Sequence, residues 1–370
     1  MFFLDVLFYA FIIVVVIQLI YYGIIFGRLA AHKNQIPTSK NIGVSIIICA
    51  KNEAENLATN LPLFLDQDYP NFEVVLINDH SSDDTLEMME GFKERHPNVK
   101  IVDVKPIEKF WGNKKYALTL GIKVASHEHL LFTDADCTPL SRQWIKEMAS
   151  HFSEEKTLVI GYGAYKKKKG SLLNVMIRFE TFMTAVQYFS YAKIGLPYMA
   201  VGRNLAYKKT QFFEANGFVN HMDIMSGDDD LFVNQVATKS NVALCISEDS
   251  FTESIPKKNL NAWMLQKRRH LGSAHFYKTK HKVLLALFYI SQLLFWTLSI
   301  VLIIFLHQWH VVLGLVALRF IVQFINLGLG AKKLNETGLM YWLPLLEISL
   351  ISFQFFIFIK NLTSKPQYWK

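Results

Sequence analysis

The chain contains little cysteine and no segment of low complexity. Among 370 residues only Cys49, Cys137 and Cys245 are cysteines, and their scattered positions match neither a disulfide framework nor a zinc site. Reduced thiols are typical of the cytosol, so we expect the polar part of the chain to lie there. No internal repeat stands out.

A motif for nucleic-acid recognition is also lacking, although the net charge is +8 and the pI is about 9.1. The basic residues gather beside long apolar segments and in the run 166–169. Anionic lipid at a cytoplasmic membrane surface explains such clusters more simply. We therefore expect membrane lipid, and no nucleic acid, as a partner.

The N-terminal segment has neither the basic start nor the small-residue cleavage site of a signal peptide. Residues 2–27 contain one acid, Asp5, and no Lys or Arg precedes Arg28. This segment is apolar and long enough to cross a bilayer. The sequence thus predicts a retained membrane anchor.

Long hydrophobic runs are abundant, since 51% of the residues are hydrophobic and 14% are aromatic. Further apolar spans at about 283–306, 310–330 and 338–359 each approach the roughly 20 residues that a helical crossing requires. We expect an N-terminal transmembrane helix at 1–27, a cytoplasmic catalytic domain at 28–282 and a membrane domain of about three helices at 283–370.

The positions of Lys and Arg predict the orientation in the membrane. Basic residues flank the polar block at Arg28, Lys33, Lys40, Lys278, Lys280 and Lys282. They place this block in the cytoplasm, and the loop at Trp309 outside. We therefore expect a multi-pass protein of a bacterial inner membrane.

The C-terminal tail conflicts with this orientation. Lys332 and Lys333 fall inside as expected, but Lys360, Lys365 and Lys370 would fall outside after a fourth crossing. Two explanations remain open: the charge rule has an exception here, or the last span is not a full crossing. We favour the exception, because the rule describes a bias.

The polar block opens with a pattern of alternating strands and helices. The β-branched runs 44–50, 72–77 and about 99–104 are typical of buried strands, and a helix is expected from about Glu53. Such βαβ units form a mainly parallel sheet, whose loops after the strands meet at one edge.

Two carboxylates directly follow another apolar run, in the sequence Thr133-Asp134-Ala135-Asp136-Cys137. If the strand continues, Asp134 and Asp136 point to the same face at its carboxyl end. Paired carboxylates at such an edge favour a hard divalent cation that is shared with substrate phosphates. A surface turn is the alternative.

Other acids are expected at the same edge, namely Asp79 and the run Asp228–Asp230. Asp79 could accept hydrogen bonds from a base or a ribose. Alternatively, Ser81, Ser82 and Asp83 cap the next helix; both can hold if the cap is Ser82 or Asp83 and Asp79 is left free. Crowding of the three acids from 228 to 230 could raise one pKa toward a value that suits a general base. The alternative is an ordinary helix N-terminus.

Five short motifs follow one another within residues 42–272. They are Ala50-Lys51-Asn52-Glu53, Asn78–Asp83, the DXD motif at 134–136, Gly227–Asp230 and Gln266–His270. This order resembles the membrane-bound family 2 glycosyltransferases, which include cellulose, hyaluronan and poly-N-acetylglucosamine synthases. The resemblance implies an α/β fold of GT-A type, a nucleotide-sugar donor such as a UDP sugar, Mg²⁺ or Mn²⁺, and inverting hexosyl transfer.

The resemblance also implies roles for single residues, with Asp229 as the base and Asp136 as the metal ligand. The residues that would bind the donor are Ala50, Asn52, Glu53, Asp79, Lys114 and Asp134. Those that would lie near the acceptor or diphosphate are Arg203, Asn204, Asp228, Gln266, Arg269 and His270. His270 replaces the tryptophan of the family pattern, which weakens a stacking platform. Alternatively, Lys114 begins a solvated helix, and residues 267–269 are juxtamembrane positive charge.

A further apolar stretch at about 171–196 is interrupted by polar and charged residues, including Arg178 and Glu180. These interruptions predict a helix at the membrane interface or over the active site.

The expected reaction is extension of a polysaccharide by a membrane-embedded enzyme. Three terminal spans are few for a polymer channel, so a membrane partner or homo-oligomer is expected, and transfer to a lipid-linked acceptor is the alternative. A catalytically silent subunit and a metal-dependent nucleotide hydrolase are the other classes. The intact acids disfavour the first, and Gln266 and Arg269 have no evident use in the second.

Overall fold

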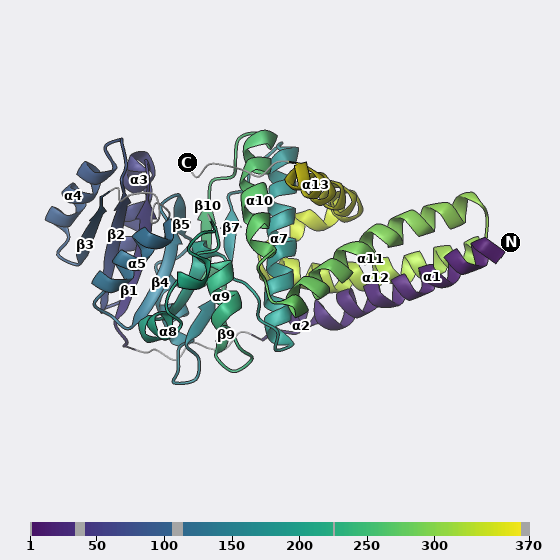
Figure 1. The fold of residues 1–370 in the computed structure, drawn as a ribbon, viewed down its shortest axis with the longest axis horizontal. Helices are drawn as coiled ribbons and strands as arrows, with labels where there is room; N and C mark the ends of the chain where they lie inside the picture. Colours follow the sequence, from purple (N-terminus) through teal and green to yellow (C-terminus); the bar gives the residue numbers. More distant parts are fainter. Residues whose placement is uncertain (1, 34–40, 106–113, 225, 364–370) are drawn as a thin grey trace.

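A computed structural model describes residues 2–33, 41–105, 114–224 and 226–363. An α/β domain occupies one end, and three long helices extend from its other side (Figure 1). Lys40, Lys365 and Lys370, which entered the charge argument, lie outside the described residues.

A seven-stranded sheet forms the centre of the α/β domain, in the order β3-β2-β1-β4-β8-β6-β9. Its strands are β1 Val44–Ala50, β2 Phe72–Asp79, β3 Val99–Val104, β4 His129–Asp134, β6 Leu158–Ile160, β8 Leu205–Lys208 and β9 Val242–Leu244. All neighbouring strands are parallel except that β8 is antiparallel to both β4 and β6. The predicted mainly parallel sheet is confirmed.

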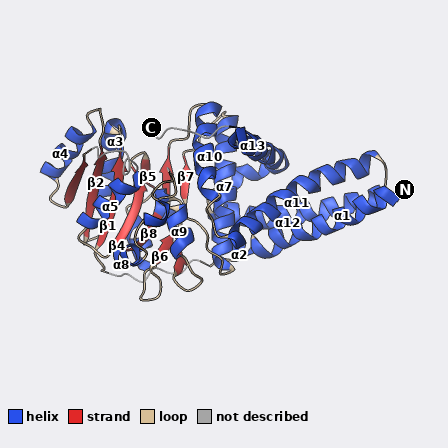
Figure 2. Cartoon of the chain, viewed as in Figure 1, coloured by secondary structure: helices blue, strands red, loops and turns tan. Residues whose placement is uncertain are grey.

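Both faces of the sheet are covered, which explains why the strands are apolar without interruption. Ile46 and Ile48 of β1 pack with Leu57 and Trp144 on one face, while Ile47 points to the other face and packs in a separate cluster. The helices beside β1–β4 are α3 Ala54–Leu65, α4 Thr85–Arg95, α5 Lys114–Val124 and α6 Trp144–Ser150. Helices and strands alternate along this part of the chain (Figure 2).

A small second sheet and short helices complete the domain. The sheet has the order β5-β10-β7, with β5 Cys137–Pro139, β7 Gly163–Tyr165 and β10 Thr252–Ser254. The remaining helices are α8 Lys209–Glu214, α9 Asp230–Val236 and α10 Leu260–Ala274.

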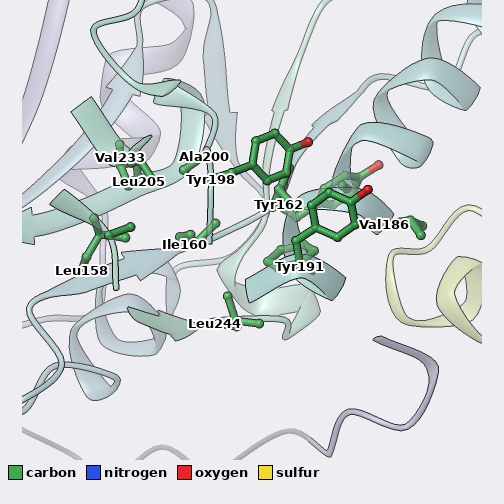
Figure 3. Close-up of a cluster of buried hydrophobic side chains, with 14 of the residues drawn as sticks. Leu158, Ile160, Tyr162, Val186, Tyr191, Tyr198, Ala200, Leu205, Val233 and Leu244 are labelled. Atoms are coloured by element: carbon green, nitrogen blue, oxygen red, sulfur yellow. The ribbon is translucent and has the colours of Figure 1, made fainter. Parts of the chain in front are cut away.

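Helix α7, Leu172–Lys193, corresponds to the helix predicted at 171–196. Its apolar side chains share one buried cluster with the sheet and with the helices of the bundle. Figure 3 shows Val186 and Tyr191 of this helix in the same cluster as Leu158, Ile160 and Leu244 of the strands, with Tyr191 nearer than Val186 to the strands. The helix therefore joins the α/β domain to the bundle.

Four helical segments are long and apolar enough to cross a membrane: 2–30, 279–304, 309–333 and 337–363. The first segment contains α1 Phe2–Leu19, a π-helical turn Ile20–Ile25 and α2 Gly27–Ala30. The second and third are α11 Thr279–Ile304 and α12 Trp309–Lys333. The fourth consists of a 3₁₀ segment, Thr337–Trp342, followed by α13 Leu343–Thr363. Helices α1, α11 and α12 lie side by side, whereas α13 runs across them beside α7 and α10 (Figure 1).

Candidate active site

The predicted edge of the sheet does gather the acidic loops. In the register of the parallel strands, Cys49 of β1 lies opposite Asp134 of β4, and Ala50 lies opposite Asn78 of β2. Asp79 is the last residue of β2. The carboxyl ends of β1, β2 and β4 therefore bring these residues to one side.

The DXD pair is brought together by a turn and not by the strand alternation that the sequence predicts. Strand β4 ends at Asp134, and Ala135 and Asp136 form a turn. Ligand atoms of Asp134, Asp136 and Cys137 lie within 4.8 Å of one another. The turn thus achieves the predicted proximity by a different backbone geometry.

The donor set of this cluster suits a hard divalent cation. The pKa of Asp136 is raised, because the side chain is buried and the neighbouring carboxylate of Asp134 repels a second negative charge. Burial and the two carboxylates also raise the pKa of the Cys137 thiol, which therefore stays protonated. The carboxylate oxygens of residues 134 and 136 are the ligands that Mg²⁺ or Mn²⁺ prefers.

Lys114 links the DXD turn to the later acidic run. Its Nζ donates to Oδ1 of Asp134 at 2.8 Å and lies 3.2 Å from Oδ2 of Asp228. Burial opposes the charge of Asp134, but Lys114 outweighs it and lowers the pKa of Asp134. Lys114 does begin α5, but its side chain is only 17% exposed, so it is not a solvated helix start.

Asp229 lines a pocket and is held in place by two backbone N–H groups. Gly202 N donates to Oδ2 at 2.6 Å, and Asp230 N donates to Oδ1 at 2.7 Å. Burial and the charges of Asp228 and Asp230 raise the pKa of Asp229 to about 8. The pocket is lined by Ile47, Cys49, Lys114, Leu118, Phe132, Thr133, Gly202, Leu205, Tyr207, Asp228 and Asp229.

The three neighbouring acids have different surroundings, so the helix N-terminus accounts for only part of the run. Asp229 caps α9. Asp230 is buried and accepts hydrogen bonds from the hydroxyls of Ser273 and Tyr277, the latter at 2.6 Å. Asp228 and Asp229 line the pocket, whereas Asp230 attaches α9 to α10.

The loops after β1 and β2 brace each other. Asn52 Oδ1 accepts from the backbone N of Ser82 at 2.8 Å, and the Glu53 backbone N donates to Thr85 Oγ1 at 2.9 Å. Ser81 and Ser82 contact Asn52, so Ser82, one of the two expected caps, does not cap α4. Asp83 alone of these three accepts from the first turn of α4, at Thr85 N.

Asp79 already has a partner in this structure. Its Oδ1 lies 2.8 Å from Nδ1 of His80, and Lys51 Nζ lies 3.1 Å from the other ring nitrogen. The Asp79 side chain is 6% exposed. His80 and Lys51 were not singled out from the sequence, although they stand inside two of the five motifs.

Arg203 and Asn204 form hydrogen bonds within the protein, and Arg203 also lies close enough to Asp134 and Asp136 to favour their charged forms. Arg203 donates to the carbonyls of Gly163 and Ala164 and to Ser254 Oγ. Asn204 is fully buried, and its hydrogen-bond partners include Trp144, Tyr162 and Ser250. These hydrogen bonds tie the small sheet to the loop before β8.

The Gln266–His270 motif lies on α10 and approaches the site from the side of the bundle. The hydroxyl of Ser226 donates to the Arg269 carbonyl at 3.1 Å, and Gln266 Nε2 lies 3.4 Å from the Tyr165 hydroxyl. His270 is exposed, and Asp134 is among the charged groups near it.

The two other basic residues of the motif form specific contacts, so the alternative of ordinary juxtamembrane charge does not describe them. Lys267 forms an ion pair with Glu180 of α7. Arg268 Nε donates to Asn361 Oδ1 of α13 at 2.8 Å. The helix that carries Gln266 and Arg269 is thereby fixed between α7 and α13.

Lys115 also contributes to the site, but it was not singled out from the sequence, because its neighbour Lys114 was the candidate. Lys115 is buried, and its Nζ donates to the carbonyls of His221 and Ile224 at 2.6 and 2.8 Å. It thereby supports the segment that leads to Asp228. The doubled lysine was the available signal.

Comparisons with known proteins agree with this architecture. Residues 45–217 match Glycosyl transferase family 2, a match that ends before Asp228. The poly-β-1,6-N-acetyl-D-glucosamine synthase of Staphylococcus epidermidis is 38% identical over 94 residues, which are 25% of this chain and 22% of that protein. Glycosyltransferase AglE of Haloferax volcanii is 32% identical over 120 residues, 32% of this chain and 38% of that one.

Among solved structures, the mannosyltransferase PcManGT of Pyrobaculum calidifontis, in complex with GDP-Man and Mn²⁺, has the same fold. It aligns with a TM-score of 0.59 and 18% identity over 90% of this chain and 98% of that chain. The sequence matches to the curated relatives cover about a fifth to two fifths of their lengths. Residues 45–217 therefore form a domain of the family 2 glycosyltransferases, and the chain has a GT-A-like fold.

Proposed function

We propose that the chain transfers a sugar from a nucleotide-sugar donor with inversion at the anomeric carbon. The observation that carries this proposal is that Lys114 contacts both Asp134 of the DXD turn and Asp228, and lines a pocket with Asp228 and Asp229. In this proposal the acceptor hydroxyl attacks the anomeric carbon, the bond to the diphosphate breaks, and the hydroxyl proton passes to a carboxylate.

Asp229 is the proposed base. Its backbone donors fix both carboxylate oxygens, and the Asp228 and Asp230 charges increase its proton affinity. A base near neutral pKa can both hold and release a proton at working pH. Asp228, held near Lys114, is proposed to keep that lysine in place beside the departing diphosphate.

Asp134 and Asp136 are the proposed ligands of Mg²⁺ or Mn²⁺. A bound divalent cation would stabilise the charge of the departing diphosphate. Lys114 orients Asp134, and the turn holds Asp136 beside it. Asp79, Ala50, Asn52 and Glu53 are proposed to form the nucleotide side of the donor site. PcManGT holds GDP-Man, so GDP sugars belong in a donor screen together with the expected UDP sugars.

We propose that the acceptor is a growing polysaccharide, as the matched segment of the poly-N-acetylglucosamine synthase suggests. A lipid-linked acceptor is the second candidate, and one observation favours it. Helices α1, α11 and α12 enclose a packed core that contains Phe11, Val14, Phe295 and Val312, which leaves no evident polymer channel among the described residues. Polymer export would then require a membrane partner or a second copy.

The activity should depend on pH through Asp229. Because a protonated carboxyl cannot accept the acceptor proton, and the pKa of Asp229 is raised to about 8, turnover should rise with pH and reach half its plateau near this value. A pH profile of kcat at saturating donor and Mn²⁺ measures it. A flat profile from pH 6 to 9 would contradict the assignment of the base.

Replacing Asp136 with Ala should remove the Mn²⁺ dependence of donor binding, because it takes away one of two carboxylate ligands. Titrations of the nucleotide with and without Mn²⁺ should differ for the native protein and coincide for the variant. The exposed Asp66, on the far end of α3, provides the control Asp66→Ala. Unchanged Mn²⁺ dependence in Asp136→Ala would exclude this residue from the metal site.

Donor turnover in native-lipid nanodiscs tests the proposal as a whole. Labelled UDP and GDP sugars would be offered with Mn²⁺, and products would be separated by size. Label in long chains supports the polysaccharide acceptor, and label in one small lipid supports the second candidate. Free sugar alone would indicate a nucleotide-sugar hydrolase, and the absence of turnover with every donor would favour the silent subunit.

A further inference from the structure

Helix α13 is long and apolar enough to cross a bilayer, yet the segment before it is held on the α/β domain. Asn335 accepts a hydrogen bond from Lys167 Nζ at 2.6 Å through its carbonyl and donates to Glu248 at 2.9 Å. Glu336 forms an ion pair with Arg178 of α7. The chain therefore enters α13 from the same side as the catalytic residues.

The other end of α13 is held on that side as well. Asn361 Oδ1 accepts from Arg268 Nε at 2.8 Å, and the Lys360 carbonyl accepts from the same guanidinium at 3.4 Å. On α10, Arg268 stands five residues before Ser273, which is about 7.5 Å along a helix. Ser273 donates a hydrogen bond to Asp230 beside the pocket. The end of α13 thus lies close to the active-site side of the protein.

A crossing helix cannot satisfy both attachments. The 21 residues of α13 span about 31 Å, which matches the thickness of a bilayer core. A crossing would place Asn361 beyond the opposite face of the membrane and far from Arg268. Along the middle of α13, Phe353 stacks on Trp263 of α10 with ring centroids 4.0 Å apart.

The face of α13 that turns away from α7 and α10 is apolar at helical spacing. Its exposed large side chains are Leu345, Ile348, Phe355, Phe356, Phe358, Ile359 and Leu362. Glu347 is buried against Arg319 of α12 and so is not part of this face. An apolar face of this kind lies stably in the headgroup and acyl boundary of a membrane.

We propose that α13 lies in the plane of the membrane, with this apolar face in the cytoplasmic leaflet, and does not cross. Lipid covers the face, and the opposite face supports α10 with its Gln266 and Arg269. The arrangement also removes the charge conflict of the C-terminal tail, because Lys360 then stays on the cytoplasmic side with Lys332 and Lys333. The proposal does not depend on which donor or acceptor the enzyme uses.

The side of the membrane can be tested with single cysteines and a maleimide that does not cross bilayers. Thr363→Cys at the end of α13 would be compared with the exposed Lys169→Cys in the α/β domain and Gln308→Cys between α11 and α12. The wild-type chain gives the labelling of its own cysteines. We expect positions 363 and 169 to be labelled in inside-out vesicles and protected in right-side-out vesicles, and position 308 to show the opposite. Labelling of position 363 together with position 308 would overturn the proposal.

Depth gives a second test that does not rely on the helix end. Nitroxides at Ile348, Phe355 and Leu362 sample one face of α13 at intervals of seven residues, which are about 10 Å apart along the axis. An in-plane helix gives the same ratio of oxygen to nickel-chelate accessibility at all three positions. A maximum of depth at Phe355, with shallow values on both sides, would show a crossing helix.

Discussion

Replacing Asp229 with Asn should abolish sugar transfer while the nucleotide still binds. Asparagine has nearly the same shape and can keep accepting hydrogen bonds from the Gly202 or Asp230 backbone N at one oxygen, but it cannot take a proton from the acceptor. Loss of a general base commonly lowers turnover by about 10²–10⁴-fold. The measurement is kcat for the variant in nanodiscs, together with the dissociation constant of the nucleotide.

Two outcomes would separate a catalytic role from a structural one. Asp229 also caps α9, so its replacement could disturb the pocket. Retained nucleotide affinity and an unchanged melting temperature show that the loss is chemical. The matched control is Asp249→Asn, an exposed carboxylate in the 3₁₀ segment Glu248–Ser250, which should leave transfer unchanged. Turnover within a few-fold of the native value in Asp229→Asn would remove this residue from the role of base.

The first strands and the position of the acids were predictable because each depends on local sequence. The β-branched run 44–50 gives a strand with the predicted bounds, since a strand buried on both faces needs an uninterrupted apolar segment. The acids stand directly after such runs, and parallel strands bring the loops at their carboxyl ends to one edge. The DXD pair was correctly expected to be close, although the backbone there forms a turn, which the sequence offered only as the alternative to a continuing strand.

The direction of individual polar side chains was not predictable, because their partners are distant in the sequence. Arg203 and Asn204 directly follow Gly202, which lines the pocket. Their own hydrogen bonds, however, reach Gly163, Ser254 and Trp144. A polar residue in a loop can equally satisfy the protein interior or a ligand. Only the tertiary arrangement of the small sheet decides between the two.

The length and hydropathy of α13 also do not determine its orientation relative to the membrane. An apolar segment of sufficient length can cross a bilayer, lie along it or pack on protein, and its tilt is set by its neighbours. The contacts of residues 335, 336 and 361 with the α/β domain supply this information. The excess of lysine after the last span was the one feature of the sequence that pointed in this direction.

Arg319 stands inside the apolar span 310–330, but one charged residue barely changes the mean hydropathy of such a span. Arg319 is fully buried in α12, and its guanidinium binds Glu347 of α13, Gln18 and Tyr22 of the N-terminal segment and Gln323. Ionisable residues in an apolar span are costly and need partners. Gln292 of α11 binds Glu347 as well, so this cluster joins all four long apolar segments.

Replacing Arg319 with Met should strongly destabilise the bundle, because it leaves the Glu347 carboxylate buried without its cation. Breaking a buried ion pair from one side costs about 3–5 kcal/mol. Glu347→Met should cost a similar amount, since the guanidinium is then left without its carboxylate. The melting temperature of the protein in nanodiscs measures the loss for each variant.

The double variant Arg319→Met with Glu347→Met tests whether the pair or each charge alone is responsible. Replacement of both ions by apolar side chains of similar volume is commonly neutral or stabilising, so the double variant should regain most of the lost stability. Because Glu347 attaches the start of α13 to the bundle, transfer activity should recover less completely than stability if α13 positions α10. Additive losses in the double variant would show that the two charges act independently, and the pair would then not be the element that fixes α13.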